Sequence, residues 1–266
     1  MNEFIIITLI IYVIIFMGDF MGFNNKIVLV TGSSKGIGKS TIIEFAKRGC
    51  NVVINYSKDD DSANELKEYI LNNYNIEVMS IKADVSNEEE VKIMIDSIIN
   101  KFGRLDILVN NAGIAIDNAF YDKSVEEFKK VLDVNLIGTY LVSKYASKYM
   151  LENKYGKIVN VSSTNGIDTF YSESVDYDAS KAGVISLTHN MAKLFAPFIN
   201  VNAVAPGWVN TDMNKELSDD FKQDEGEKIF LKRFADSSEI AKVIVFLCSD
   251  DASYVNNSII RVDGGF

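Results

Sequence analysis

The sequence predicts an α/β fold: a single domain built on a doubly wound parallel sheet of about seven strands. Short β-rich runs alternate with longer segments of helical periodicity from Lys26 onwards, which is typical of repeated βαβ units. Most of the short runs are continuously apolar, as expected of strands covered by helices on both faces. No repeat, linker or change of composition divides the chain, so we expect one domain over residues 23–266.

The predicted strands follow one another at the spacing of βαβ units. They are Ile27–Val30, Val52–Asn55, Val78–Ala83, Ile107–Val109, Lys157–Val161, Val201–Ala205 and Ile259–Val262. Between the third and fourth strands, apolar residues from Val91 to Ile99 recur at helical spacing and predict a helix with one buried face. Ser86 and Glu89 have the spacing of a capping box that would open this helix. The charged stretch from Asp212 to Lys232 is either a mobile lid or a solvated surface helix.

Composition and charge exclude several classes of protein. The 27 Lys and Arg residues against 37 Asp and Glu residues give a net charge of −10, with no basic run, so no nucleic-acid partner is expected. Cys50 and Cys248 are far apart and without a metal-binding spacing, which predicts buried free thiols in a reduced cytoplasmic protein and no metal site. His189, the single histidine, has no motif around it and is interpreted as a structural or surface residue.

The first 22 residues form an apolar extension that stands apart from this pattern. Phe4 to Met17 carries no charge, but it is shorter than the ~20 residues that span a bilayer. No Lys or Arg precedes it and no cleavage site follows, so a signal peptide is disfavoured. We favour a translation start at Met21; a weak membrane anchor, with contact through residues 4–17 alone, is the alternative.

A glycine-rich turn connects the first strand to a helix expected over Lys39–Arg48. Its sequence is Thr31-Gly32-Ser33-Ser34-Lys35-Gly36-Ile37-Gly38. Glycines at such a turn let a pyrophosphate approach the helix N-terminus, where unpaired N–H groups and the helix dipole favour negative charge. The turn therefore predicts a dinucleotide site, although its glycine spacing differs from the G-x-G-x-x-G fingerprint.

Further motifs follow in a characteristic order. They are Asn110-Asn111-Ala112-Gly113, Asn135, Ser163, the pair Tyr177-x-x-x-Lys181, Pro206-Gly207 and the terminal Val262-Asp263-Gly264-Gly265. Together with the glycine turn they resemble the short-chain dehydrogenase/reductase family over residues 26–266. The resemblance implies a Rossmann-type fold and an oxidoreductase that moves a hydride between a nicotinamide cofactor and a carbonyl or alcohol carbon.

Tyr177 and Lys181 are four residues apart and share one face of a helix. A free tyrosine, with a pKa of about 10, transfers protons poorly near neutrality, and we expect the Lys181 ammonium to lower the pKa of Tyr177. Ser163 follows the strand that ends at Val161, where its hydroxyl can reach a crevice at the carboxyl edge of the sheet. Its neighbour Ser162 is the alternative, because the interval of fourteen residues to Tyr177 is longer than is common in the family.

The resemblance implies a role for each of four catalytic residues. Tyr177 would protonate the carbonyl oxygen, Lys181 would hold the nicotinamide ribose, and Ser163 would hydrogen-bond the substrate oxygen. Asn135 would organise a water-linked proton relay with Lys181. The structural alternatives are that Asn135 caps or kinks its helix and that Ser163 satisfies a turn.

The same resemblance places the cofactor along the ends of several strands, and the charges around the second strand indicate which nicotinamide is used. Besides Tyr177 and Lys181, the expected contacts are Gly32, Ser34, Lys35, Gly36, Ile37, Gly38, Tyr56, Ser57, Lys58, Asp84, Val85, Asn111, Ala112, Gly113, Pro206, Gly207, Val209 and Thr211. Asp84 is alternatively a turn-forming residue, and Pro206-Gly207 a simple turn. The second strand ends without the acid that grips an NAD ribose, while Lys35, Ser57 and Lys58 suit a 2′-phosphate, so NADP(H) is predicted. Asp59-Asp60-Asp61 leaves NAD(H) open.

Within the family the chain is most similar to 3-oxoacyl-acyl-carrier-protein reductases. This likeness implies a 3-oxoacyl thioester substrate on an acidic acyl carrier protein, fatty-acid biosynthesis, and a homotetramer or homodimer. Lys154 and Lys193 would meet the carrier. The alternatives are an NAD(P)-dependent enzyme for another ketone, sugar or secondary alcohol, and a non-catalytic nucleotide-binding module, which the presence of Tyr177 and Lys181 disfavours.

Overall fold

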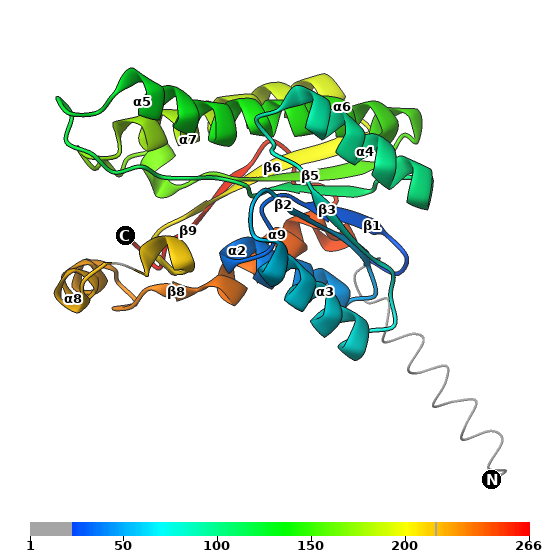
Figure 1. The fold of residues 1–266 in the computed structure, drawn as a ribbon, viewed down its shortest axis with the longest axis horizontal. Helices are drawn as coiled ribbons and strands as arrows, with labels where there is room; N and C mark the ends of the chain where they lie inside the picture. Colours follow the sequence, from blue (N-terminus) through cyan, green and yellow to red (C-terminus); the bar gives the residue numbers. More distant parts are fainter. Residues whose placement is uncertain (1–22, 216) are drawn as a thin grey trace, which may run out of the picture.

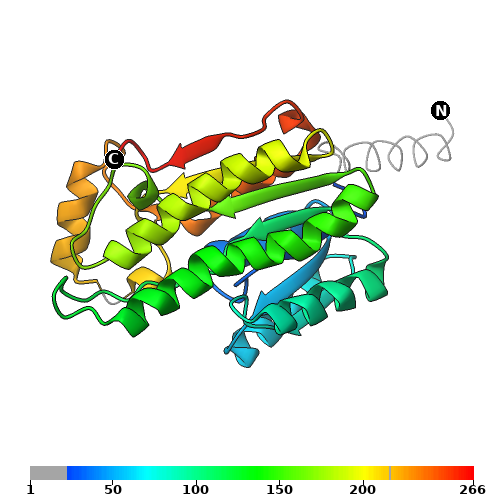
Figure 2. The ribbon, with the colours of Figure 1, turned by 90° about the horizontal axis from the view of Figure 1, so that it is seen from above.

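A parallel sheet of seven strands lies between two layers of helices (Figures 1 and 2). The structure is a computed structural model that describes residues 23–215 and 217–266. The strand order is β3-β2-β1-β4-β5-β6-β9, and every neighbouring pair is parallel. The strands are β1 Ile27–Val30, β2 Asn51–Tyr56, β3 Val78–Lys82, β4 Ile107–Asn110, β5 Gly156–Val161, β6 Ile199–Pro206 and β9 Ile259–Val262. The predicted doubly wound, Rossmann-type α/β fold is confirmed, with each strand within two residues of its expected bounds.

The two helical layers pack on opposite faces of the sheet (Figure 1). One contains α2 (Gly36–Ala46), α3 (Asp60–Asn73) and α9 (Ser237–Cys248); the other contains α4 (Glu88–Phe102), α5 (Val125–Leu132), α6 (Gly138–Glu152) and α7 (Val175–Phe195). Alternate residues of β1 enter opposite cores: Val28 and Val30 pack toward α2 and α9, whereas Ile27 and Leu29 pack toward α4 and α6. Coverage of both faces explains why the strands are continuously apolar.

Two helix starts differ from the sequence-based expectation. The cap of α4 is Asn87, whose Oδ1 accepts hydrogen bonds from the N–H groups of Glu89 (3.1 Å) and Glu90 (3.3 Å). The predicted capping box of Ser86 and Glu89 is wrong, because the Ser86 hydroxyl donates instead to Asp84 Oδ1 at 2.6 Å. Helix α2 spans Gly36–Ala46 rather than Lys39–Arg48, since the glycine turn leads into the helix at Gly36 itself.

A small second sheet and a short helix lie beside the carboxyl edge of the main sheet. Strand β7 (Val209–Asn210) pairs with β8 (Ala235–Asp236), and α8 (Asp219–Lys228) lies beside them (Figure 1). The stretch from Asp212 to Lys232 therefore contains a helix, and its proposed movement as a lid stays a prediction. Glu225, buried on α8, accepts hydrogen bonds from Trp208 Nε1 (3.1 Å) and Tyr171 Oη (3.0 Å), which attach the helix to the main body.

The sequence also led to expectations for the two cysteines, the single histidine and the N-terminal extension. Cys50 and Cys248 are buried free thiols, as predicted. His189 is exposed and its Nδ1 lies 2.6 Å from Asn257 Oδ1, in agreement with a surface role. The interpretations of residues 1–22 concern residues outside those that the structure describes. Among the described residues, no helix combines the length and apolar character that crossing a bilayer requires.

Candidate active site

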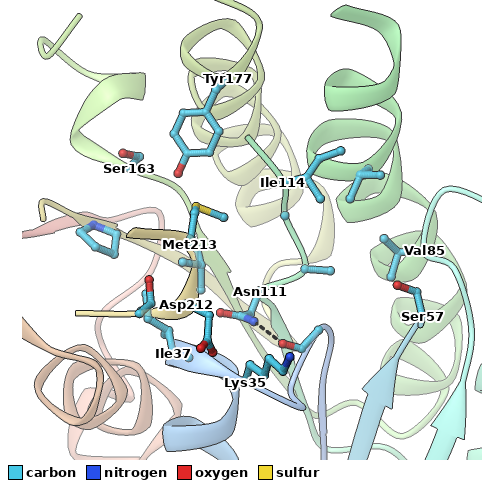
Figure 3. Close-up of a pocket in the computed structure, with 18 of the residues that line it drawn as sticks. Lys35, Ile37, Ser57, Val85, Asn111, Ile114, Ser163, Tyr177, Asp212 and Met213 are labelled. Atoms are coloured by element: carbon cyan, nitrogen blue, oxygen red, sulfur yellow. Dashed lines mark hydrogen bonds between the residues drawn. The ribbon is translucent and has the colours of Figure 1, made fainter. Parts of the chain in front are cut away.

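A cavity of about 380 Å³ opens at the carboxyl edge of the sheet, beside the neighbouring strands β1 and β4. The chain leaves β1 toward α2 on one face of the sheet and leaves β4 toward α5 on the other face. Figure 3 shows the hydroxyls of Ser163 and Tyr177 facing one end of this cavity and Lys35 at the other. Most of the predicted site residues line it: Gly32, Lys35, Gly36, Ile37, Ser57, Lys58, Asp84, Val85, Asn111, Ala112, Gly113, Ser163, Tyr177, Lys181, Pro206, Gly207, Val209 and Thr211. The fold therefore brings together motifs that are spread over 180 residues of sequence, from Gly32 to Thr211.

Four predicted residues, Ser34, Gly38, Tyr56 and Asn135, are not part of the cavity lining. At Gly38 a Cβ atom would lie 2.6 Å from Asn111 Nδ2, so glycine is needed for the packing of α2 on the turn. The Tyr56 hydroxyl donates to Asp60 Oδ1 at 3.0 Å. These two residues support the walls of the cavity from outside it.

The glycine turn is held against the segment that follows β4. Asn111 Nδ2 donates to the carbonyl oxygens of Thr31 (2.9 Å) and Gly32 (3.0 Å), as drawn in part in Figure 3. Thr31 Oγ1 accepts from the N–H groups of Asn111 and Ala112, both at 3.0 Å. Gly32 has φ +59°, and a Cβ there would lie 2.8 Å from Ala112 Cα. The turn is thus a rigid backbone cradle at the N-terminus of an eleven-residue helix, which fits the diphosphate of a dinucleotide.

Asn55 is a site residue to which sequence reasoning assigned no role. It is buried at the end of β2, where its Oδ1 accepts from Gly32 N (3.1 Å) and its Nδ2 donates to Ala83 O (3.0 Å). It therefore ties the glycine turn to the end of β3. The sequence did contain a signal for this role: Asn55 has an amide side chain near the end of the second strand, where NAD-binding proteins usually have an acid. Other lining residues lie in segments without a motif: Ile114, Lys130, Val134, Asp212, Met213 and Asn214.

Lys35, the candidate for a 2′-phosphate, has a carboxylate partner. Its Nζ lies 2.5 Å from Asp59 Oδ2, and both side chains are open to solvent. Asp59 also caps α3 by accepting from Ser62 N at 3.0 Å. The hydrogen bond from Lys35 lowers the pKa of Asp59 to about 2, and the pKa of Lys35 is raised by the same contact. Asp59 therefore competes with the 2′-phosphate of the cofactor for Lys35, the residue that the sequence analysis assigned to that phosphate.

Asp84 serves the turn that was its alternative interpretation. Its Oδ1 accepts from Ser86 N at 2.9 Å and from the Ser86 hydroxyl at 2.6 Å. Asp84 and Val85 nevertheless border the cavity, so a turn role and an adenine contact are compatible.

Tyr177 and Lys181 lie on the first turns of α7, beside the segment that follows β5. Lys181 Nζ lies 5.4 Å from the centre of the Tyr177 ring and donates to Val161 O at 2.9 Å. The Ser162 hydroxyl donates to Lys181 O at 2.9 Å, so it is committed to the backbone of α7. The Ser163 hydroxyl faces the cavity beside Tyr177 (Figure 3), which favours Ser163 over its neighbour.

The protonation of this pair differs from the sequence-based expectation. Desolvation raises the pKa of Tyr177 to about 12; the nearby Ser163 hydroxyl opposes the increase, and the carboxylates of Asp178 and Asp117 add to it. Burial lowers the pKa of Lys181 to about 8. The prediction that the pKa of Tyr177 is lowered is wrong for this structure, because removal of the phenol from water is the largest effect on this pKa and raises it. Tyr177 consequently keeps its proton at neutral pH.

Asn135 lies in a π-helical turn, Asp133–Ile137, between α5 and α6. Its Oδ1 accepts from Ile114 N (2.8 Å), and its Nδ2 donates to Ile114 O (2.9 Å) and to Ser180 Oγ (3.0 Å). A Cβ on Gly113 would lie 3.3 Å from Asn135 Oδ1 and 3.5 Å from Lys181 Nζ, so the two side chains converge on this glycine. The amide clamps the segment after β4 to α7; its part in a proton relay stays a prediction.

A dinucleotide cradle joined to a cavity with a desolvated tyrosine, a buried lysine and a serine defines a class of nicotinamide-dependent oxidoreductases. Comparisons with known proteins agree. A family model described as "Enoyl-(Acyl carrier protein) reductase" matches residues 32–266. The chain belongs to the short-chain dehydrogenase/reductase family, whose members act on CH–OH and C=O groups with a nicotinamide cofactor.

Several relatives share nearly the whole chain. A 3-oxoacyl-[acyl-carrier-protein] reductase FabG of Aquifex aeolicus is 40% identical over 241 residues, which cover 90% of this chain and 96% of the relative. The FabG of Staphylococcus epidermidis is 41% identical over 242 residues, covering 91% and 98%. Among solved structures, levodione reductase has a TM-score of 0.86 at 32% identity and covers 91% of this chain and 97% of its own.

Proposed function

We propose that the protein reduces 3-oxoacyl thioesters carried on acyl carrier protein to 3-hydroxyacyl thioesters with NADPH. The observation that carries the proposal is the identity of about 40% with reductases of that name, along 90% of this chain. The cavity supports it, because its end nearest Tyr177 offers hydroxyl donors for a carbonyl oxygen. The homotetramer or homodimer and the cytoplasmic location remain predictions.

Tyr177 is the proposed proton donor. When bound, the nicotinamide supplies the hydride that reaches the carbonyl carbon. Tyr177 gives its hydroxyl proton to the carbonyl oxygen, and a pKa of about 12 keeps that proton available at neutral pH. Ser163 donates a hydrogen bond to the same oxygen and holds the carbonyl against Tyr177. Lys181, fixed by Val161 O, holds the nicotinamide ribose, and Asn135 serves the proton relay that restores the Tyr177 hydroxyl.

The proposed cofactor position follows the lining of the cavity. The glycine turn and the N-terminus of α2 hold the diphosphate, and Asp84 and Val85 contact the adenine. Lys35, Ser57 and Lys58 hold the 2′-phosphate of NADPH, with Asp59 as the group that the phosphate must displace from Lys35. The remainder of the proposed cofactor site is lined by Pro206, Gly207, Val209 and Thr211.

The carrier protein would reach this cavity from its carboxyl-edge mouth. Lys154 and Lys193 do not flank that mouth within one chain: Lys154 precedes β5, and Lys193 lies near the end of α7, which leads into β6. Both therefore lie at the amino edge of the sheet, with Lys193 about 18 Å along the helix from Lys181. The predicted parallel strands already imply this edge, since Lys154 precedes the strand expected from Lys157 and Lys193 precedes the one expected from Val201.

The test is an assay of NADPH oxidation with acetoacetyl-acyl-carrier-protein beside a panel of simple ketones and sugars. We expect turnover on the 3-oxoacyl thioester at a kcat/KM well above that of the other carbonyls. Turnover confined to another carbonyl would replace the substrate and keep the mechanism; the structural similarity to levodione reductase makes cyclic diketones a necessary part of the panel. NADPH binding without turnover on any substrate would overturn the proposed enzyme and favour the nucleotide-binding module.

A further inference from the structure

A chain of hydrogen bonds connects Ser163 to Asp178 through Asn165. The Ser163 hydroxyl donates to Asn165 Oδ1 at 3.0 Å, and Asn165 N donates to Ser163 Oγ at 3.2 Å. Asn165 Nδ2 in turn donates to Asp178 Oδ1 at 2.7 Å. Asn165 lies in a 3₁₀ turn, Thr164–Gly166, and Asp178 directly follows Tyr177 on α7. The chain thus connects the two residues proposed to touch the substrate oxygen.

The chemistry of these groups gives the chain one direction. A carboxylate accepts hydrogen bonds and does not donate them, so Asp178 requires the NH₂ end of the Asn165 amide. The amide oxygen is then left to face Ser163. The second carboxylate oxygen of Asp178 accepts from Tyr171 N at 3.3 Å, which fixes the segment between Ser163 and α7 as well. One side chain therefore sets both the orientation of Asn165 and the course of the loop that carries it.

We propose that Asn165 and Asp178 are positioning residues of this active site, Asp178 by orienting Asn165 and Asn165 by holding Ser163 beside Tyr177. The proposal rests on the proposed reduction of a carbonyl, though on no particular substrate. In the arrangement observed, the Ser163 proton points to Asn165 Oδ1. When a carbonyl oxygen enters, rotation about the Cβ–Oγ bond turns that proton to the substrate. The Asn165 N–H keeps the Ser163 oxygen in place and makes its hydroxyl a stronger donor.

Asp178 has an additional electrostatic effect on Tyr177. Its negative charge contributes to the raised pKa of Tyr177, together with Asp117 from the segment after β4. The other groups that face Tyr177 are Ser163 and the Lys181 ammonium. Asp176 is neutralised by Lys123, which lies 2.9 Å away. Removal of the Asp178 charge should therefore lower the pKa of Tyr177, whereas removal of the Asn165 side chain should not.

Steady-state kinetics of three variants tests the proposal: Asn165→Ala, Asp178→Ala and the double variant. Loss of one hydrogen bond that orients Ser163 should reduce kcat roughly tenfold in each single variant, with a smaller change in KM. Because both residues act through Ser163, the double variant should lose little more than either single one.

Asp168→Ala is the matched control, since it removes a carboxylate of the same loop that pairs with Arg261 at 2.7 Å. It should leave kcat and KM unchanged. Independent losses that multiply in the double variant, or losses that fall on KM and leave kcat unchanged, would overturn the proposal.

A measurement without turnover separates this proposal from the proposed function. Hydrogen exchange of the Tyr171 amide, followed by NMR on the NADPH-bound protein, should accelerate at least tenfold in Asp178→Ala and keep the wild-type rate in Asp168→Ala. Unchanged exchange at Tyr171 would contradict the positioning role even if no carbonyl substrate were found. Any carbonyl that the wild-type protein reduces serves equally well for the kinetic arm.

Discussion

Tyr177 and Lys181 are ionisable side chains that the protein removes from water to different effect. Desolvation raises the pKa of Tyr177 to about 12 and lowers that of Lys181 to about 8, and in both cases it disfavours the charged form. The tyrosine therefore stays a neutral acid over the range in which the lysine begins to lose its proton. Proton donation to a carbonyl oxygen requires that neutral phenol.

Replacement of Tyr177 by phenylalanine tests its role. The ring remains and the proton donor is lost, so turnover should fall by two to four orders of magnitude while NADPH affinity stays within about twofold. The rate of NADPH oxidation measures turnover, and the quenching of protein fluorescence on addition of NADPH measures its affinity. Appreciable activity in Tyr177→Phe would exclude the proposed proton transfer.

The lowered pKa of Lys181 predicts a dependence of stability on pH. Between its folded pKa of about 8 and its ordinary value of 10.5, the unfolded chain binds the proton and the folded protein does not. Stability contributed by this group should therefore rise as pH increases through that window. Urea unfolding from pH 7 to 10, compared between wild type and Lys181→Met, should show the increase in the wild type alone. Parallel curves would contradict the lowered pKa.

Lys35 and Asp59 predict how the cofactor is chosen. Lys35→Glu should weaken NADPH roughly tenfold or more, because a charge-assisted contact to the 2′-phosphate is lost, and should change NADH little. Asp59→Asn should have the opposite sign, since it frees Lys35 from its 2.5 Å ion pair. Titrations with both nucleotides measure the two ratios. Equal losses for NADPH and NADH in Lys35→Glu would remove this basis for NADPH preference.

Helix α7 is anchored to the segment before α5 by a buried ion pair. Lys123 Nζ lies 2.9 Å from both carboxylate oxygens of Asp176, and the two side chains are 3% and 0% exposed. Asp176 Oδ1 also accepts from Tyr177 N at 2.9 Å, so the ion pair is linked directly to the backbone of Tyr177 in the first turn of α7. The pair connects the helix that carries Tyr177 to the wall of the cavity.

Breaking this pair should destabilise the protein strongly. Lys123→Met leaves the Asp176 carboxylate buried without a counter-charge, which costs about 3–5 kcal/mol of the free energy of unfolding. The double variant Lys123→Met/Asp176→Asn removes the orphaned charge and keeps an acceptor for Tyr177 N, so it should recover a large part of the loss. Denaturant unfolding measures both. A double variant as unstable as Lys123→Met would show that charge burial is not the cause.

The helices and strands were predicted with unequal success, for local reasons. Strands β1 and β9 match the predicted bounds because polar residues flank each of them: Lys26 and Thr31 for β1, Ser258 and Asp263 for β9. The start of α4 was missed because Ser86 and Asn87 are both possible acceptors for the Glu89 N–H, and Asp84 decides the outcome by accepting the Ser86 hydroxyl. Helix α8 lacks an apolar stripe; its attachment through Glu225 to Trp208 and Tyr171 is visible only in three dimensions.

Both cysteines of the protein are buried in its hydrophobic core. Cys50 and Cys248 belong to the core between the sheet and helices α2 and α9, and burial raises the pKa of each thiol. We therefore expect no reaction with Ellman's reagent in the native protein and two equivalents of thiol in denaturant. Rapid labelling of the native protein would show that this core opens without global unfolding.

The sequence by itself determined the order of strands and helices along the chain, the glycine turn, and most of the residues that meet at the cavity, because periodicity, turn chemistry and motif spacing are local properties of a chain. The tertiary structure decided the rest: the pKa values of Tyr177 and Lys181, the pairing of Lys35 with Asp59, and the chain from Asp178 to Ser163. Desolvation and charge pairing depend on groups brought together from distant parts of the sequence, and no local pattern encodes which groups those are.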